Sequence, residues 1–224
     1  MSLYIDIYND LPLRCAEVWE KYRASAAEQG REVTLMLMAA TAGFAMPWDK
    51  LSRKDDSALI RSIDKNRKSY DKAVDKLVKE LSKTISDKEN ELFEGVYFDN
   101  WKYFQIPDLS NIKNIIEMGL NKNEKPDLLK NRAVLKILRN ALAHNNLHAT
   151  GDGIGGEIYF ITFISQIVED KKVVGFHVLT LSVRDFEIIL DNWFNFMKKI
   201  KKQYIPKIGL NDFLSSAISE HDYA

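Results

Sequence analysis

The stretch VLKILRNALAH, residues 134–144, decides the fold of this 224-residue chain. With about 100° of rotation per residue along a helix, one side of the stretch collects its apolar residues. These residues are Val134, Leu135, Leu138, Ala141 and Leu142. Such a stripe predicts an amphipathic helix that packs on the core of a helical domain. The sequence predicts this helix over residues 126–149.

The same predicted helix carries Arg139, Asn140 and His144 outside its apolar stripe. Asn140 and His144 are four residues apart and share a face, whereas Arg139 points about 140° away from His144. The small side chain of Ala143 lies between Arg139 and His144, and the long arginine stem can reach back toward it. The spacing therefore predicts a shallow gap flanked by a guanidinium and an imidazole.

These residue types suit cleavage of an RNA phosphodiester by its own 2′-hydroxyl. An imidazole can move protons near neutral pH, and a guanidinium matches a phosphate through paired hydrogen bonds. Asn140 would orient the imidazole or donate to a phosphate oxygen. Because one helix offers only one well-placed histidine, a twofold homodimer would present two copies to one phosphate. The residues therefore predict Arg139, Asn140 and His144 as catalytic, with His148 and Asn145 as auxiliary candidates.

A structural explanation of the same residues stays open. An arginine and a histidine at this spacing occur by chance on many helices, where they pair with surface carboxylates. His148, near the end of the predicted helix, can interact with the terminal carbonyl groups. The pair alone does not separate this explanation from catalysis.

The composition limits how the chain can contact a nucleic acid. Apolar residues make up 46% of the chain and charged residues 29%, which is typical of a globular protein. The 32 Lys and Arg residues equal the 32 Asp and Glu residues in number, so the formal net charge is zero. Proteins that coat nucleic acids are usually basic. Any RNA contact is therefore expected in a local patch or cleft.

The sequence predicts no metal and no cofactor. Cys15 is the only cysteine, which excludes an internal disulfide and a cysteine metal cluster. The four histidines lack a carboxylate spacing such as H-E-x-x-H. The segment GDGIGG, residues 151–156, matches G-x-G-x-x-G, but a helix precedes it and a strand follows. This order is the reverse of the dinucleotide fingerprint, so the segment is interpreted as a flexible connection into a hairpin.

The remaining patterns predict a mainly α domain with one antiparallel β-hairpin inserted before the C-terminal helix. Further helices are predicted over residues 11–29, 33–46, 112–121 and 182–202, with one or two within 53–93. The hairpin is predicted from the β-branched and aromatic residues of 157–168 and 173–181. Five aromatic residues near the start of 97–111 predict a loop pinned to the core, with base stacking as the less favoured alternative.

The apolar run at residues 33–46 is expected to be the most buried element, because it is apolar on nearly every face. The whole apolar stretch, residues 33–48, is shorter than a membrane helix requires. The N-terminal segment lacks the basic region of a secretory signal. We therefore expect a single cytoplasmic domain over residues 1–224, with a core over 10–202, a tail over 203–224, and no membrane partner.

The segment from Arg139 to His144 resembles the R-x(4–6)-H signature of HEPN domains, in which a polar residue commonly follows the arginine. The segments GREVTLMLMAATAGFAMPWDKLS, residues 30–52, and VRDFEIILDNWFNF, residues 183–196, are similar to a HEPN subfamily known mainly from bacterial and plasmid sequences. The resemblance covers most of residues 10–200 and implies a HEPN-like helical bundle.

The resemblance also implies a function. It implies a metal-independent ribonuclease that acts on RNA as a homodimer, with the motif helix at the interface and Arg139, Asn140 and His144 as catalytic residues. Many members of the family belong to toxin–antitoxin, phage-defence or stress systems, which would add an antitoxin or regulatory protein as a partner. Other members have lost activity and bind nucleotide, RNA or a partner protein. A helical scaffold whose Arg139 and His144 only pair with carboxylates is the third alternative.

Overall fold

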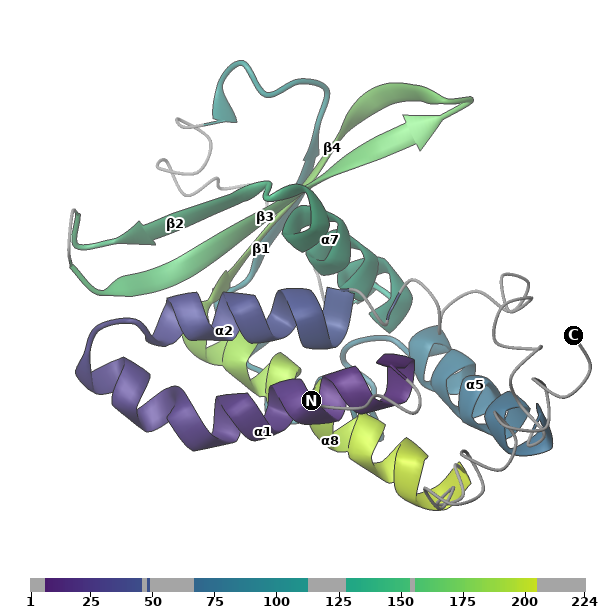
Figure 1. Ribbon diagram of the computed structural model, residues 1–224. Helices are drawn as coiled ribbons and strands as arrows, with labels where there is room; N and C mark the ends of the chain where they lie inside the picture. The colour runs from purple at the N-terminus through teal and green to yellow at the C-terminus, as the bar shows by residue number, and fades with distance from the viewer. Residues whose placement is uncertain (1–6, 46–47, 49–66, 113–127, 154–155, 205–224) are drawn as a thin grey trace, which may run out of the picture.

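The computed structural model describes residues 7–45, 48, 67–112, 128–153 and 156–204 (Figure 1). In this part of the chain five α-helices accompany a four-stranded antiparallel sheet formed late in the sequence. None of the described helices is long and apolar enough to cross a membrane. Part of the predicted 53–93 region, nearly all of the predicted 112–121 helix and residues 205–224 of the predicted tail lie outside the described residues.

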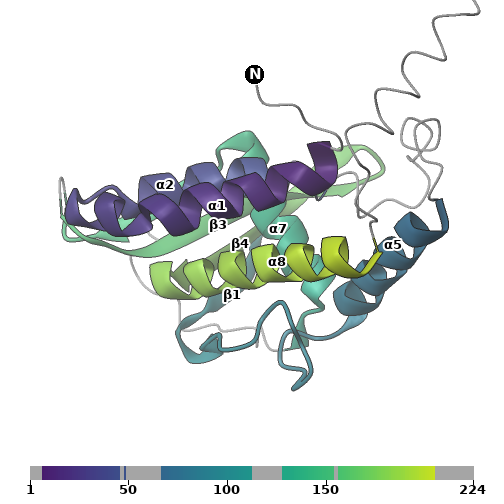
Figure 2. The same ribbon diagram turned by 60° about the horizontal axis from the view of Figure 1, so that its bottom comes forward.

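The predicted first helix is confirmed as α1 (Ile7–Glu28), which turns back at Gly30 into α2 (Glu32–Ala40). Gly30 has a φ of 65°, a left-handed conformation that glycine adopts at little cost. The last helix, α8 (Val183–Tyr204), packs beside α1, and both lie in front of the sheet in Figure 2. The Trp19 indole donates a hydrogen bond of 2.8 Å to Asp191 Oδ1 and so ties α1 to α8.

The apolar run at residues 33–46 is helical as predicted, but it is not buried on every face. Met36 is fully buried, whereas Met38 is 65% exposed, so the prediction that this run is the most buried element is wrong. The reason is that α2 packs mainly on one side against α1, and a π-helical turn, η1 (Thr41–Ala45), follows it. A Cβ atom at Gly43 would lie 2.7 Å from Phe194 Cε1, so a small residue permits this close approach to α8.

The predicted hairpin is confirmed as β3 (Ile158–Glu169) and β4 (Lys172–Ser182). Two shorter strands extend it into a sheet of order β1-β4-β3-β2. Strand β1 (Lys102–Ile106) comes from the aromatic segment that was predicted as a loop. Strand β2 (Leu147–Gly151) comes from residues that were predicted partly as helix. The fold is therefore mixed α/β and mostly helical, and a bundle with a single hairpin is too simple a description.

One face of the sheet completes the core beneath the helices. It contributes Tyr103, Ile161, Phe163, Leu179 and Leu181 to the same buried cluster as the helices. The predicted helix over 182–202 is confirmed as α8, and its start is capped, because the Asp185 backbone N–H donates to Ser182 Oγ at 3.0 Å. Helix α5 (Arg67–Ser82) is the part of the predicted 53–93 helical region that the structure describes as helix.

Candidate active site on helix α7

The motif lies on α7 (Asn131–His144), which packs on β3 and on η1 (Figure 1). All five residues of the predicted apolar stripe are at most 5% exposed, so the predicted core-facing side is confirmed. The N-terminus of α7 is anchored by Asn131, whose backbone N–H donates to Lys83 O at 2.9 Å. The Asn131 side chain also donates to Glu80 O at 2.8 Å. The motif therefore lies on a helix that is fixed by hydrogen bonds at its N-terminus and by packing along its apolar face.

The predicted helix of residues 126–149 is too long at both ends. Asn145 adopts a left-handed conformation with φ 54° and ψ 35°. Its N–H donates to Leu142 O at 3.3 Å, and the Asn146 N–H donates to Ala141 O at 2.9 Å. These two bonds form a Schellman motif, which satisfies the last carbonyl groups and turns the chain away from the helix axis. The Asn146 carbonyl then accepts a hydrogen bond from the Ile164 N–H at 3.0 Å, and strand β2 begins.

Arg139 and Asn140 are joined by a chain of hydrogen bonds that ends on the sheet. Arg139 Nη1 donates to Asn140 Oδ1 at 2.8 Å, and Asn140 Nδ2 donates to Ser165 Oγ on β3 at 3.0 Å. Because both ends of the Asn140 amide are engaged, a flip of the amide would break both bonds. The guanidinium of Arg139 thus lies against the side chain of Asn140.

His144 is the last residue of α7, and its side chain is exposed. Among the described residues, no hydrogen bond or ion pair joins its imidazole to Arg139 or Asn140. The structure thus brings two of the three predicted catalytic residues into direct contact. It leaves the third residue, His144, exposed to solvent at the end of the same helix.

The two auxiliary candidates do not continue the helix. Leu147 lies opposite the core residue Phe163 in the β2–β3 register, and His148 lies opposite Thr162. Because successive strand side chains point to opposite faces, His148 lies on the face of the sheet that is turned away from α7. Its predicted place one turn after His144 is wrong, because the left-handed turn at Asn145 ends the helix first.

A polar row on the sheet lies next to the Asn140 contact, and no pattern in the sequence indicates it. His177 on β4 lies directly opposite Ser165 on β3 and opposite Gln105 on β1. His177 Nδ1 and the Tyr103 hydroxyl are 2.9 Å apart, and Gln105 Nε2 donates to the same hydroxyl at 3.1 Å. The Tyr103 and His177 rings are stacked, with centroids 6.0 Å apart. The site therefore places a second imidazole near the motif, from a different element. The strand register that brings these residues together could not be deduced from the sequence.

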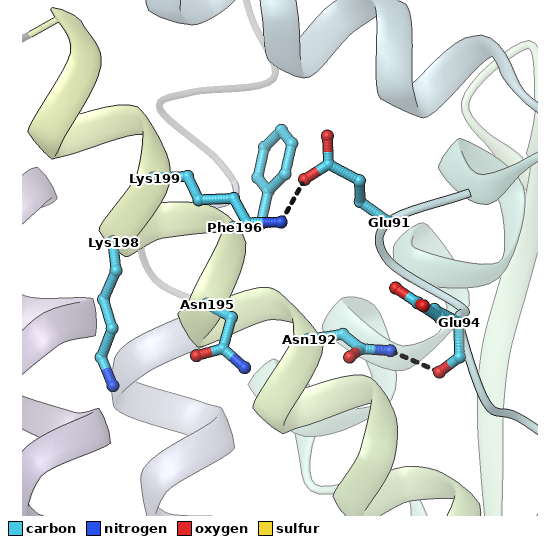
Figure 3. A pocket seen from close by; sticks show the side chains of 7 residues that line it. All are labelled: Glu91, Glu94, Asn192, Asn195, Phe196, Lys198 and Lys199. Carbon is cyan, nitrogen blue, oxygen red and sulfur yellow. Dashed lines mark hydrogen bonds and ion pairs between the residues drawn. The ribbon is translucent and has the colours of Figure 1, made fainter. Parts of the chain in front are cut away.

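Two further features bear on binding. Among the described residues, no group of three His, Cys, Asp or Glu side chains could hold a metal ion. A cavity of about 320 Å³ lies between α8 and the loop at residues 91–94, but no motif residue lines it (Figure 3). Its Lys199 ammonium lies 2.8 Å from Glu91, and this hydrogen bond lowers the pKa of the Glu91 carboxyl. Asn192 in the same cavity donates to Glu94 O at 2.9 Å. Several of the cavity's polar groups are therefore already engaged with one another.

A layer of helices lies on a short antiparallel sheet, and Arg139, Asn140 and His144 all lie on helix α7. The chain belongs to the family described as HEPN pEK499 p136, which matches residues 1–204. This match confirms the resemblance to plasmid-type HEPN domains. HEPN domains are generally associated with ribonuclease activity in defence and toxin–antitoxin systems. No curated protein and no solved structure matches the chain.

Proposed function

We propose that this protein is a metal-independent endoribonuclease whose catalytic residues are Arg139, Asn140 and His144. The observation that carries the proposal is the hydrogen-bonded chain from Arg139 through Asn140 to Ser165. This chain orients a guanidinium on the same helix as a solvent-exposed imidazole. A preoriented cation and a proton-transfer group are what transesterification of RNA needs from a protein.

The proposed reaction starts at the 2′-hydroxyl of the RNA. His144 removes the hydroxyl proton, the 2′-oxygen forms a bond to phosphorus, and the bond from phosphorus to the 5′-oxygen breaks. The departing oxygen takes up a proton, so the products are a 2′,3′-cyclic phosphate and a 5′-hydroxyl. Arg139 binds the non-bridging oxygens, whose negative charge grows in the transition state. Asn140 holds the guanidinium in that position.

The proposed active form is a homodimer with α7 near the twofold axis. In one chain His144 is the exposed imidazole of the motif, whereas the reaction both removes and delivers a proton. A second copy of His144 across a twofold axis would supply the second proton-transfer group. Family membership further supports a role in a toxin–antitoxin or defence system in the cytoplasm, in which an antitoxin or regulatory protein restrains the nuclease.

Cleavage of a defined RNA in EDTA tests the proposal. The parent should cleave it, and His144→Ala should not. His148→Ala is the matched control, because this histidine lies on the other face of the sheet and should be dispensable. A 2′-deoxy residue at the cut site should block cleavage, since it removes the nucleophile.

Activity that disappears in EDTA, or that survives His144→Ala, would contradict the mechanism. Absence of cleavage on every RNA tried would favour the alternative, a non-catalytic HEPN module that binds nucleotide, RNA or a partner protein.

A further inference from the structure

The charge of α7 differs from that of the chain as a whole. The protein has equal numbers of basic and acidic residues, yet no Asp or Glu occurs between Leu128 and Gly151. Within this range α7 carries Arg132, Lys136 and Arg139, and its first turn contains no acidic residue. The helix is therefore a local source of positive charge on a neutral protein.

The cations of α7 lie along one line. At about 100° per residue, Arg132, Lys136 and Ala143 fall within roughly 40° of one another, and Arg139 lies about 20° beyond Arg132. Arg132 and Lys136 are both exposed, and a helical rise of about 1.5 Å per residue places them roughly 6 Å apart along the axis. The line leads to exposed Ala143, beside the motif histidine. It is thus continuous with the candidate active site.

This arrangement has an electrostatic cost within the folded protein. Arg132 and Lys136 are like charges four residues apart, which destabilises a helix. Arg132 also lies in the first turn, where the helix dipole disfavours a cation. Among the described residues neither side chain makes an ion pair, whereas Lys83 and Lys199 elsewhere on the surface contact carboxylates. A bound polyanion would offset the repulsion that the protein itself leaves uncompensated.

From these observations we propose that the solvent-facing line of α7 binds the sugar–phosphate backbone of a single RNA strand. Arg132 and Lys136 contact successive phosphates and lead the strand to the motif. The inference rests on the proposed function, because it assigns the substrate contacts of that same site. In the proposed dimer, two α7 helices near a twofold axis would repel each other through these cations. An RNA strand held between the helices would reduce that repulsion.

The test measures binding of a fluorescein-labelled 20-nucleotide oligouridylate to the full chain. The His144→Ala background keeps the strand intact during the measurement. Arg132→Gln combined with Lys136→Gln should raise the Kd on the order of tenfold at 0.1 M salt. The slope of log K against log salt should become shallower by about 1.4, or about 0.7 for each lost phosphate contact on a single strand. The matched control combines Lys21→Gln with Arg31→Gln, which removes the same two charges from exposed positions on α1 and at the α1–α2 turn.

A charge reversal separates binding from folding. Lys136→Glu places a carboxylate four residues from Arg132, so the melting temperature should stay the same or rise while RNA affinity falls further than with Lys136→Gln. An unchanged Kd and salt slope in the paired glutamine variant would overturn the proposal. So would an equal loss of affinity in the control pair, or binding of a polyglutamate peptide as tightly as the RNA.

The RNA-binding role of Arg132 and Lys136 and the proposed nuclease activity can be refuted independently. If the chain with His144 intact cleaves RNA, the paired glutamine variant should raise KM by more than it lowers kcat. Cleavage with an unchanged KM would refute RNA binding by Arg132 and Lys136 but would still support the nuclease activity. RNA binding with the expected salt dependence but without cleavage would refute the nuclease activity and would still support RNA binding by Arg132 and Lys136.

Discussion

Ser165→Ala tests whether the sheet positions the motif. The substitution removes the acceptor that holds Asn140 Nδ2 at 3.0 Å, and it leaves the apolar stripe of α7 untouched. Ser165 itself is only 3% exposed, but Asn140 is half-buried, so water can partly replace the lost acceptor. The expected loss of unfolding free energy is therefore about 1 kcal/mol, the lower end of the range for a buried donor left without a partner.

The effect on catalysis should exceed what this small loss of stability implies. A released Asn140 amide can rotate. Its Oδ1 atom, which accepts a hydrogen bond from Arg139 Nη1 at 2.8 Å, then no longer fixes the guanidinium. If the transition state loses about 1 to 1.4 kcal/mol of stabilisation, kcat falls roughly fivefold to tenfold. Single-turnover cleavage of a defined RNA at 25 °C measures this effect, and urea unfolding measures the stability of the same preparation.

Thr162→Val is the control for Ser165→Ala. Thr162 lies on the same strand as Ser165 and is fully buried, but its side chain points to the other face of the sheet. On that face its hydroxyl is 2.8 Å from the hydroxyl of Thr180. Its loss should cost a comparable amount of stability and leave kcat unchanged. Equal kcat values for the two variants would refute the positioning role of Ser165. An activity loss fully explained by the unfolded fraction would refute it as well.

His144→Ala should lower the cleavage rate by on the order of 10² to 10⁴, and Arg139→Ala by roughly 10², with circular dichroism spectra like that of the parent; cleavage at the parental rate would contradict both roles. Gly43→Ala should reduce stability by about 1 to 3 kcal/mol in urea unfolding, because the new Cβ would lie 2.7 Å from a side chain of α8, and a melting temperature equal to the parent's would show that this contact relaxes freely. The Lys199 ammonium lowers the pKa of the Glu91 carboxyl, so this partly exposed pair stabilises the fold above the carboxyl's unfolded-state pKa and loses its effect as pH falls through the folded-state pKa. Lys199→Gln should therefore cost less than about 1 kcal/mol at neutral pH and nothing in strong acid, and a difference that persists in acid would count against an electrostatic cause.

The sequence by itself determined the elements whose side chains carry a clear period. The apolar stripe of α7 and the β-branched residues of the hairpin at 158–182 appear where the pattern predicts them. The helix predicted over 182–202 begins as α8 near its expected start, where Ser182 and Asp185 form a hydrogen bond within one turn. In each case the burial of one face, or a hydrogen bond within one turn, decides the structure. Such preferences depend on residues close together in the chain.

Tertiary structure decided the features whose stabilising partners are distant in the sequence. Strands β1 and β2 have five residues each, too few for a distinct period, and they are strands because β4 and β3 supply their hydrogen bonds. The run at 33–46 looks uniformly apolar, but packing on one side leaves Met38 in solvent. Ser165 and His177 come close to the motif only through the strand register and the packing of α7 on β3. Arg139, Asn140 and His144 could be chosen from the sequence because one helix carries all three, whereas the residues that hold them in place come from other elements and become neighbours only when the chain folds.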